Sequence, residues 1–286
     1  RPTPGLIPQD RTEKKDDLPI LSTLGVLGRT PDDIALMLDA IAGKHSLDPF
    51  SFDTSRNFRE YFLSDKEFCA TKIGWLRDCN GYYETENQIL TLCENILSKL
   101  SMSKITVDEV RFQNKLSLLW KSWKTLRSKT LYNELSSWNL LEEEKVFSVK
   151  WELEQGSVIE ESEIKEALKV REEWLDEVNN LFKKFEFLTM PSSQVFPFDK
   201  NIAYPNILNG IELDSYHKWM EIVTIPSLLG LPVVSVPVGF NEKGLPMGMQ
   251  VIAKKGEDLK LLSFAKRYEE LIKASEVKPE LQKLID

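Results

Sequence analysis

The sequence predicts an α/β fold in which helices cover a β-sheet. In the first half, two strand-like segments flank a helical one, and in the second half a long helical region precedes further strand-like segments. Parallel strands need a crossover connection, which a helix commonly supplies, so this order favours a sheet with parallel pairs and helical cover. Apolar residues make up 42% of the 286 and charged residues 29%, as in ordinary globular proteins.

The chain opens with irregular structure and then a helix. Residues 1–30 are rich in Pro and Gly and include a charged run at 11–17, which is typical of loops. A helix is predicted to follow. Thr30 is a suitable N-cap, Pro31 suits the first helical position, and Gly43 marks the end.

A strand–helix–strand unit comes next. The segment KIGWL at 72–76 reads as a strand, and residues from about 84 to 100 have a helical pattern. The segment ITVDEVRF at 105–112 alternates with period two. We therefore expect two parallel strands joined by a helical crossover.

The region from about 115 to 184 is predicted to be mostly helical. Breaks are expected near Asn139 and at Gln155-Gly156. Five of the seven tryptophans fall in this region, and aromatic residues at that density more often line helix packing than a surface on which bases stack.

The C-terminal part is predicted to contain three strands and a helix. Residues 185–192 read as a strand that ends in a turn. Residues 233–240 and 247–255 read as a hairpin, because Gly244 in NEKGLP can supply the positive φ that a tight turn needs. An amphipathic helix is expected from about 258 to 273.

Composition excludes several classes of function. The net charge of -8 and the lack of a run of Lys and Arg argue against direct nucleic-acid binding. The apolar stretch 222–240 is interrupted by Pro and Gly, so no membrane span is expected.

The cysteines and histidines predict neither a metal site nor a disulfide framework. Cys69, Cys79 and Cys93 form no Cys-x-x-Cys pair, and we interpret them as reduced thiols of a cytoplasmic protein. His45 and His217 lie in no recognisable motif, so each is expected to be a surface or core histidine. No metal and no organic cofactor is predicted.

Four passages, in the right order, resemble the amidase signature family. RPTPGLIP at the start is similar to the Lys-Pro-Thr-x-Gly phrase that closes the family's Gly- and Ser-rich signature. STLGVLGRTPDDIALMLDAIAG is similar to the stretch that follows it. FEFLTMPSSQVFP occupies the place of a strand ending at Pro, and TIPSLLGLPVVSVPVGFNEKGLPMGMQVIAKK closely resembles the family's C-terminal phrase. No family motif is recognised in the middle of the chain, from about 57 to 184.

The resemblance implies a mixed β-sheet covered by helices on both faces. It also implies that residues 1–286 are the C-terminal part of a single amidase domain, with 115–184 resembling an insertion. The family's catalytic Ser-Ser-Lys triad precedes the Pro-Thr-x-Gly phrase, so all three residues would lie upstream of Arg1. We interpret the start at Arg1 as a truncation and expect no catalytic residue in this chain.

Several residues could be mistaken for catalytic ones. Ser192-Ser193 lacks the flanking glycines of an oxyanion cradle, so we expect a turn after a strand. Ser227 and Ser235 are read as loop and strand positions. Glu221 stands near an acidic residue of amidotransferase A-type subunits, but we interpret it as a solvated helix carboxylate. The stretch 219–229 is the predicted edge of a substrate pocket.

Three functions remain open. The first is hydrolysis of a small or medium amide by the complete protein, with no direct nucleic-acid or membrane partner and with a homodimer allowed. The second is an amidotransferase A-type subunit, and the third is a non-catalytic amidase-like remnant. Pocket shape decides the substrate in this family, and we expect the region 115–184 to set it.

Overall fold

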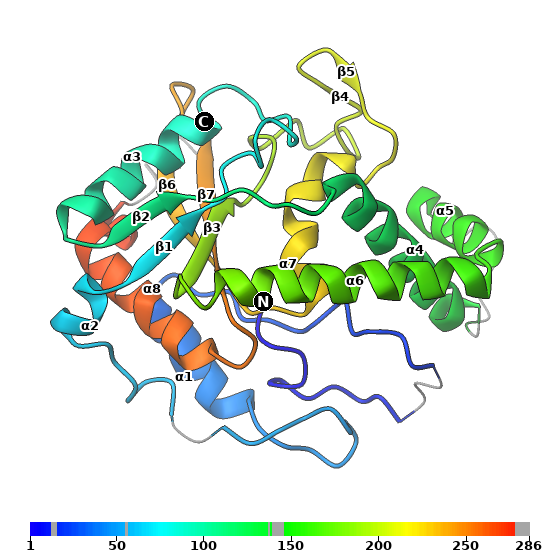
Figure 1. The fold of residues 1–286 in the computed structure, drawn as a ribbon, viewed down its shortest axis with the longest axis horizontal. Coiled ribbons are helices and arrows are strands. Elements are labelled where there is room, and N and C mark those ends of the chain that lie inside the picture. The colour runs from blue at the N-terminus through cyan, green and yellow to red at the C-terminus, as the bar shows by residue number, and fades with distance from the viewer. Residues whose placement is uncertain (13–15, 55–56, 137, 139–145, 278–286) are drawn as a thin grey trace.

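The computed structural model describes residues 1–286 apart from 13–15, 55–56, 137, 139–145 and 278–286. Its centre is a five-stranded mixed sheet in the order β2-β1-β3-β7-β6 (Figure 1). The parallel strands β2 and β3 flank β1, and β7 runs antiparallel to both β3 and β6. The strands are β1 (Lys72–Trp75), β2 (Thr106–Glu109), β3 (Phe187–Pro191), β6 (Val233–Phe240) and β7 (Pro246–Ala253).

Helices cover the sheet on both faces, as predicted. In Figure 1, α3 (Ile89–Met102) lies to the left of the strands, α8 (Asp258–Ile272) runs from the left to below them, and α6 (Glu161–Leu181) and α7 (Thr224–Leu229) lie to the right. On the α8 side, the rings of Phe264 and Phe187 lie 4.7 Å apart. The helix α3 is the crossover between parallel strands β1 and β2, so the predicted strand–helix–strand unit is confirmed.

Local signals place the first helix and the last hairpin correctly. The helix α1 (Pro31–Ile41) begins after Thr30, whose hydroxyl accepts a hydrogen bond from the Asp33 N–H at 3.2 Å. That contact satisfies one of the free N–H groups of the first turn. Gly244 turns the chain between β6 and β7 with φ 76°. Residues 1–30 contain no helix or strand within their described part.

One predicted helix is too long, and several short elements were not predicted. The helix α3 begins at Ile89 rather than near residue 84, because Gln88 has φ 77° and cannot continue a helix. The short helix α2 (Asp65–Cys69) was missed. So was a hairpin of β4 (Ile207–Leu208) and β5 (Ile211–Glu212).

The long helical region consists of α4 (Leu116–Leu135), α5 (Phe147–Ser157) and α6. The predicted break near Asn139 lies outside the described residues. The predicted break at Gln155-Gly156 is wrong, because both residues lie within α5. A Cβ atom on Gly156 would clash with the Ser128 carbonyl oxygen, so glycine allows α5 to approach α4 closely. Of the tryptophans in this region, Trp120, Trp123 and Trp174 are buried in helix packing as predicted, whereas Trp138 is exposed.

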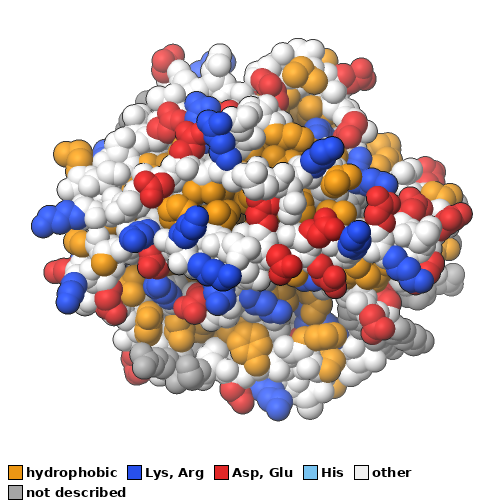
Figure 2. Space-filling view, in the orientation of Figure 1, with side chains coloured by type: hydrophobic (Ala, Val, Ile, Leu, Met, Phe, Trp, Pro, Cys, Tyr) orange, Lys and Arg blue, Asp and Glu red, His pale blue; other side chains and the backbone are white. Residues whose placement is uncertain are grey.

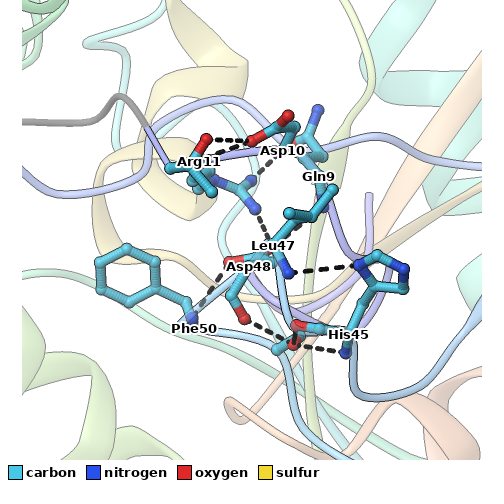
Figure 3. A network of polar contacts seen from close by, with 9 residues as sticks. Gln9, Asp10, Arg11, His45, Leu47, Asp48 and Phe50 are labelled. Carbon is cyan, nitrogen blue, oxygen red and sulfur yellow. Dashed lines mark hydrogen bonds and ion pairs between the residues drawn. The ribbon is translucent and has the colours of Figure 1, made fainter.

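A buried aspartate organises the loops around α1. The Asp48 carboxylate accepts hydrogen bonds from the backbone N–H groups of Gln9 and Phe50, each at 3.0 Å, and pairs with Arg11 (Figure 3). His45 lies at the surface next to this network, where its Nδ1 accepts from the Leu47 N–H at 3.3 Å. The prediction that His45 is a surface or core histidine is confirmed.

The first residues are fixed to the C-terminal half of the chain. The Thr3 N–H and hydroxyl donate to the Asp258 carboxylate at 2.7 and 2.5 Å. Arg1 and Val233 exchange two main-chain hydrogen bonds, one from the Arg1 amino group at 2.9 Å and one to the Arg1 carbonyl at 2.7 Å. Such an exchange has the pattern of a hydrogen-bonded pair in antiparallel strands, and it lies at β6, the edge strand of the sheet, although Arg1 itself belongs to no strand.

Candidate functional site

A pocket of about 440 Å³ opens beside the end of β3 and the β6–β7 hairpin. Its size falls within the range of small-molecule sites. Most of its wall is apolar, and Phe196, Val236 and Met247 are buried there. The lining residues are Ser192, Ser193, Val195, Phe196, Pro197, Phe198, Trp219, Ser235, Val236, Pro237, Pro246, Met247 and Gly248.

Two serine hydroxyls meet at this pocket. The chain leaves β3 at Ser192, whose N–H donates to the Gly248 carbonyl at 3.0 Å. The Ser192 and Ser235 Oγ atoms lie 2.7 Å apart and share a hydrogen bond. A Cβ on Gly248 would lie 2.9 Å from the Ser235 Oγ, so glycine at this position leaves room for both hydroxyls.

The other serines occupy structural positions. Ser193 follows the strand in a turn, as predicted, and its Oγ accepts from the Val195 N–H at 3.1 Å. Ser227 was predicted to be a loop residue, which is wrong, because it lies within α7. Its hydroxyl donates to the Leu21 carbonyl at 3.1 Å and accepts from Trp123 Nε1 at 3.3 Å, which fixes the N-terminal segment to α7 and α4.

Two buried glutamines hold the pocket wall in place. Gln194 donates to the Glu84 carbonyl at 3.0 Å and accepts from the Ile222 N–H at 3.2 Å. Gln250 donates to the Pro191 carbonyl at 2.8 Å. Together these side chains tie the segment after β3 to η2 (Lys218–Val223), a 3₁₀-helix that carries the pocket residue Trp219. Of the predicted pocket edge 219–229, only Trp219 is among the described lining residues.

Glu221 is not the solvated carboxylate that we predicted. It is 1% exposed, and it accepts a hydrogen bond from the Tyr82 hydroxyl at 2.7 Å and pairs with Lys218. Burial raises the pKa of Glu221, and the contacts with Lys218 and Tyr82 oppose that shift. No local pattern indicates this environment, because Tyr82 lies 139 residues earlier in the chain.

A second buried carboxylate, Glu152, lies in the helical region. Its oxygens accept hydrogen bonds from Arg127 Nε at 2.9 Å and from the Ser128 hydroxyl at 2.6 Å. The Tyr216 hydroxyl lies 2.8 Å from it and His217 Nε2 lies 3.0 Å from it. This Glu152 network therefore joins α4 and α5 to the residues just before η2. His217 is a core histidine, as predicted, and burial lowers its pKa.

Two further observations concern metals and membranes. Among the described residues, no group of three or more His, Cys, Asp and Glu side chains is placed to hold a metal ion. None of the described helices combines the length and apolar character needed to cross a bilayer. Figure 2 shows Lys and Arg side chains interspersed with Asp and Glu over the described part of the face in view.

Curated relatives are A-type subunits of a transfer-RNA amidotransferase. The A-type subunit of the glutamyl-tRNA(Gln) amidotransferase of Prochlorococcus marinus strain MIT 9211 is 28% identical in an alignment of length 281 that covers 87% of this chain and 55% of the relative. The corresponding protein of Rickettsia bellii strain RML369-C is 36% identical over 121 residues, 40% of this chain and 22% of the relative. Where the match extends over most of this chain, the chain thus spans only about half the length of the relative.

Solved structures share the fold at low sequence identity. A bacterial aryl acylamidase of the amidase signature family superposes with a TM-score of 0.80 at 19% identity, over 96% of this chain and 58% of that one. The A-type subunit of the Thermotoga maritima glutamyl-tRNA(Gln) amidotransferase gives 0.69 at 23% identity, over 94% and 57%. The amidase family model matches residues 1–262, in agreement with the resemblance found in the sequence. The chain belongs to the amidase signature family.

Proposed function

We propose that the complete protein hydrolyses the C–N bond of a linear, non-peptide amide. The observation that carries this proposal is the family match over residues 1–262. The apolar pocket beside the end of β3 supports it, because its size falls within the range of sites that bind small molecules.

In this proposal the catalytic residues lie upstream of Arg1. A serine hydroxyl is a weak nucleophile until a base takes its proton, and in this family a second serine and a lysine form that base. The nucleophilic serine attacks the amide carbonyl, the amine leaves with a proton, and water then cleaves the acyl-enzyme. Backbone N–H groups of the Gly-rich loop hold the oxyanion. Residues of this chain supply pocket walls and no catalytic group.

The serines at the pocket do not form a triad with the described residues. Ser192 shares its hydrogen bond with Ser235, and no lysine or histidine is among the described residues that line the pocket. Without a base, neither hydroxyl can be activated. We therefore expect the chain 1–286 alone to be inactive.

We further propose that residues 1–286 are the C-terminal part of one amidase domain. Arg1 pairs with Val233 on the outer edge of β6, so an extended segment before Arg1 would continue along that strand. The region 115–184 is proposed as an insertion-like part of the same domain that influences substrate choice. The Glu152 network supports this role, because it connects that region to Tyr216 and His217, next to the pocket residue Trp219.

The test compares two proteins, the proposed complete protein, which is longer, and the chain 1–286. Each is given a panel of linear amides, and release of ammonia or amine is measured. Turnover is expected only with the longer protein, and replacing the signature serine by alanine should abolish it. Turnover by chain 1–286 that is lost in Ser192→Ala would place the nucleophile in this chain and refute the proposal.

A second candidate function is that of an amidotransferase A-type subunit. The relatives from Prochlorococcus marinus favour it, since their similarity extends over 87% of this chain. Purification of the natural protein from its own cells separates the two functions. A second subunit that copurifies and accepts ammonia from glutamine supports the transferase, whereas an active lone monomer or homodimer supports the hydrolase. A cooperatively folding protein with neither activity would support the third possibility, a non-catalytic remnant.

A further inference from the structure

We propose that the pocket beside β3 binds the uncharged, flat apolar part of an aryl amide and discriminates against charged amides such as glutamine. This inference rests on the proposed amide hydrolysis and specifies its substrate class.

The pocket wall carries no charge within the described part of the chain. None of the described residues that line the pocket is ionisable, and their polar side-chain groups are three serine hydroxyls and the Trp219 indole N–H. The nearby acid Glu221 is already paired with Lys218 and hydrogen-bonded to Tyr82. A free amino acid would therefore find no charged partner for its ammonium and carboxylate groups among these residues, which is unfavourable wherever binding takes those groups out of water.

The shape and chemistry of the apolar wall suit a planar ring. Phe198 and Trp219 lie edge to face, with ring centroids 5.4 Å apart and planes at 83°. Phe196, Val236 and Met247 add buried apolar surface. Aromatic rings prefer edge-to-face and offset-stacked contacts, so a planar aryl group can extend this arrangement.

The paired hydroxyls offer a neutral polar contact. In the Ser192–Ser235 hydrogen bond one hydroxyl donates, and the other therefore keeps its own proton for a further partner. Both oxygens also keep acceptor capacity. An uncharged carbonyl or amide group attached to an aryl ring can use one donor and one acceptor of this kind. The pocket thus combines an apolar wall with hydrogen-bonding groups that carry no charge.

The test measures binding separately from catalysis. The probes are acetophenone, which has a ring and a carbonyl but no C–N bond, its charged analogue 4-acetylbenzoate, and glutamine. Binding to the longer natural protein is measured by calorimetry. Acetophenone should bind at least about tenfold more tightly than 4-acetylbenzoate, because the carboxylate would lose water without a partner. Equal or tighter binding of 4-acetylbenzoate or glutamine would overturn the inference.

A charge placed at the pocket gives an independent check. Phe198→Arg adds a cation at a lining residue that is 38% exposed, so folding should be retained. This variant should shift the preference toward 4-acetylbenzoate by about tenfold. The matched control is Phe240→Arg, on β6 but outside the pocket lining and 52% exposed, which should leave the preference unchanged. The same shift in both variants would show that the probes do not bind in this pocket.

Amide turnover, assayed in parallel, separates the two proposals. If the protein hydrolyses glutamine but does not bind acetophenone, the proposed hydrolysis stands and this inference about the pocket fails. If it binds acetophenone selectively but hydrolyses no amide, the inference about the pocket stands and the proposed hydrolysis fails.

Discussion

Replacing Glu152 by glutamine should destabilise the protein strongly, although the side chains are nearly isosteric. Burial alone would raise the pKa of Glu152, but the hydrogen bonds that it accepts and the nearby Arg127 charge outweigh burial and lower the pKa from 4.5 to about 2. At about 1.4 kcal/mol per pKa unit, the ionised form is favoured by roughly 3 kcal/mol in the folded state. The glutamine side chain of the variant is neutral and lacks that contribution. Its NH₂ group also faces one of the donors that bond to the Glu152 carboxylate in the wild type. We expect a loss of about 2–4 kcal/mol.

The assay is urea unfolding at several pH values, with Glu154→Gln as the control. Glu154 lies in the same helix but is exposed. Because the folded pKa of Glu152 is depressed, its stabilisation is present above pH 4.5 and is lost as the pH falls toward about 2. The difference in free energy of unfolding between wild type and Glu152→Gln should therefore become smaller as the pH is lowered from 4.5 toward about 2. If the loss of unfolding free energy in Glu152→Gln at neutral pH is within about 0.5 kcal/mol of the loss in Glu154→Gln, the reasoning is refuted.

Three further predictions concern the packing and the sheet edge. Gly156→Ala should cost about 1–3 kcal/mol in thermal unfolding, because the new Cβ would clash with the Ser128 carbonyl oxygen; an unchanged melting temperature would contradict the close helix approach. Burial raises the folded pKa of Glu221, so the wild type should lose stability as the pH rises above 4.5, whereas Glu221→Gln has no such group to titrate. The free energy of unfolding that the substitution costs should therefore shrink with rising pH; a pH-independent cost in urea unfolding would argue against the pKa shift. If a segment precedes Arg1 in the complete protein, as proposed, the Ser235 amide should be protected from hydrogen exchange, since that segment would pair with it; rapid exchange would rule out the pairing.

Much of the fold follows from local signals. The cap at Thr30 and the glycine turn at Gly244 predict the neighbouring elements correctly. Two missed elements also carried a readable signal. Ser64 and Glu67 form a capping box at α2, and Asn209-Gly210, with φ of 49° and 81°, is a typical hairpin turn.

The remaining errors arise from contacts that no local pattern encodes. Gly156 reads as a helix break, yet it lies within α5 because the neighbouring helix α4 passes too close for a side chain. Glu221 reads as a surface residue, yet Tyr82 and Lys218 enclose it. The pocket likewise combines segments near residues 192, 219 and 235–248, and only the middle one was predicted.

The attachment of Thr3 to Asp258 affects the order in which the chain can fold during synthesis. The two residues are 255 positions apart, so at about 5–20 residues per second the ribosome needs on the order of ten to fifty seconds to make the second after the first. Thr3, which is buried in the finished protein, lacks the acceptor of its two hydrogen bonds throughout that interval. The N-terminal segment consequently reaches its final attachment only late in synthesis, after most of the chain has been made.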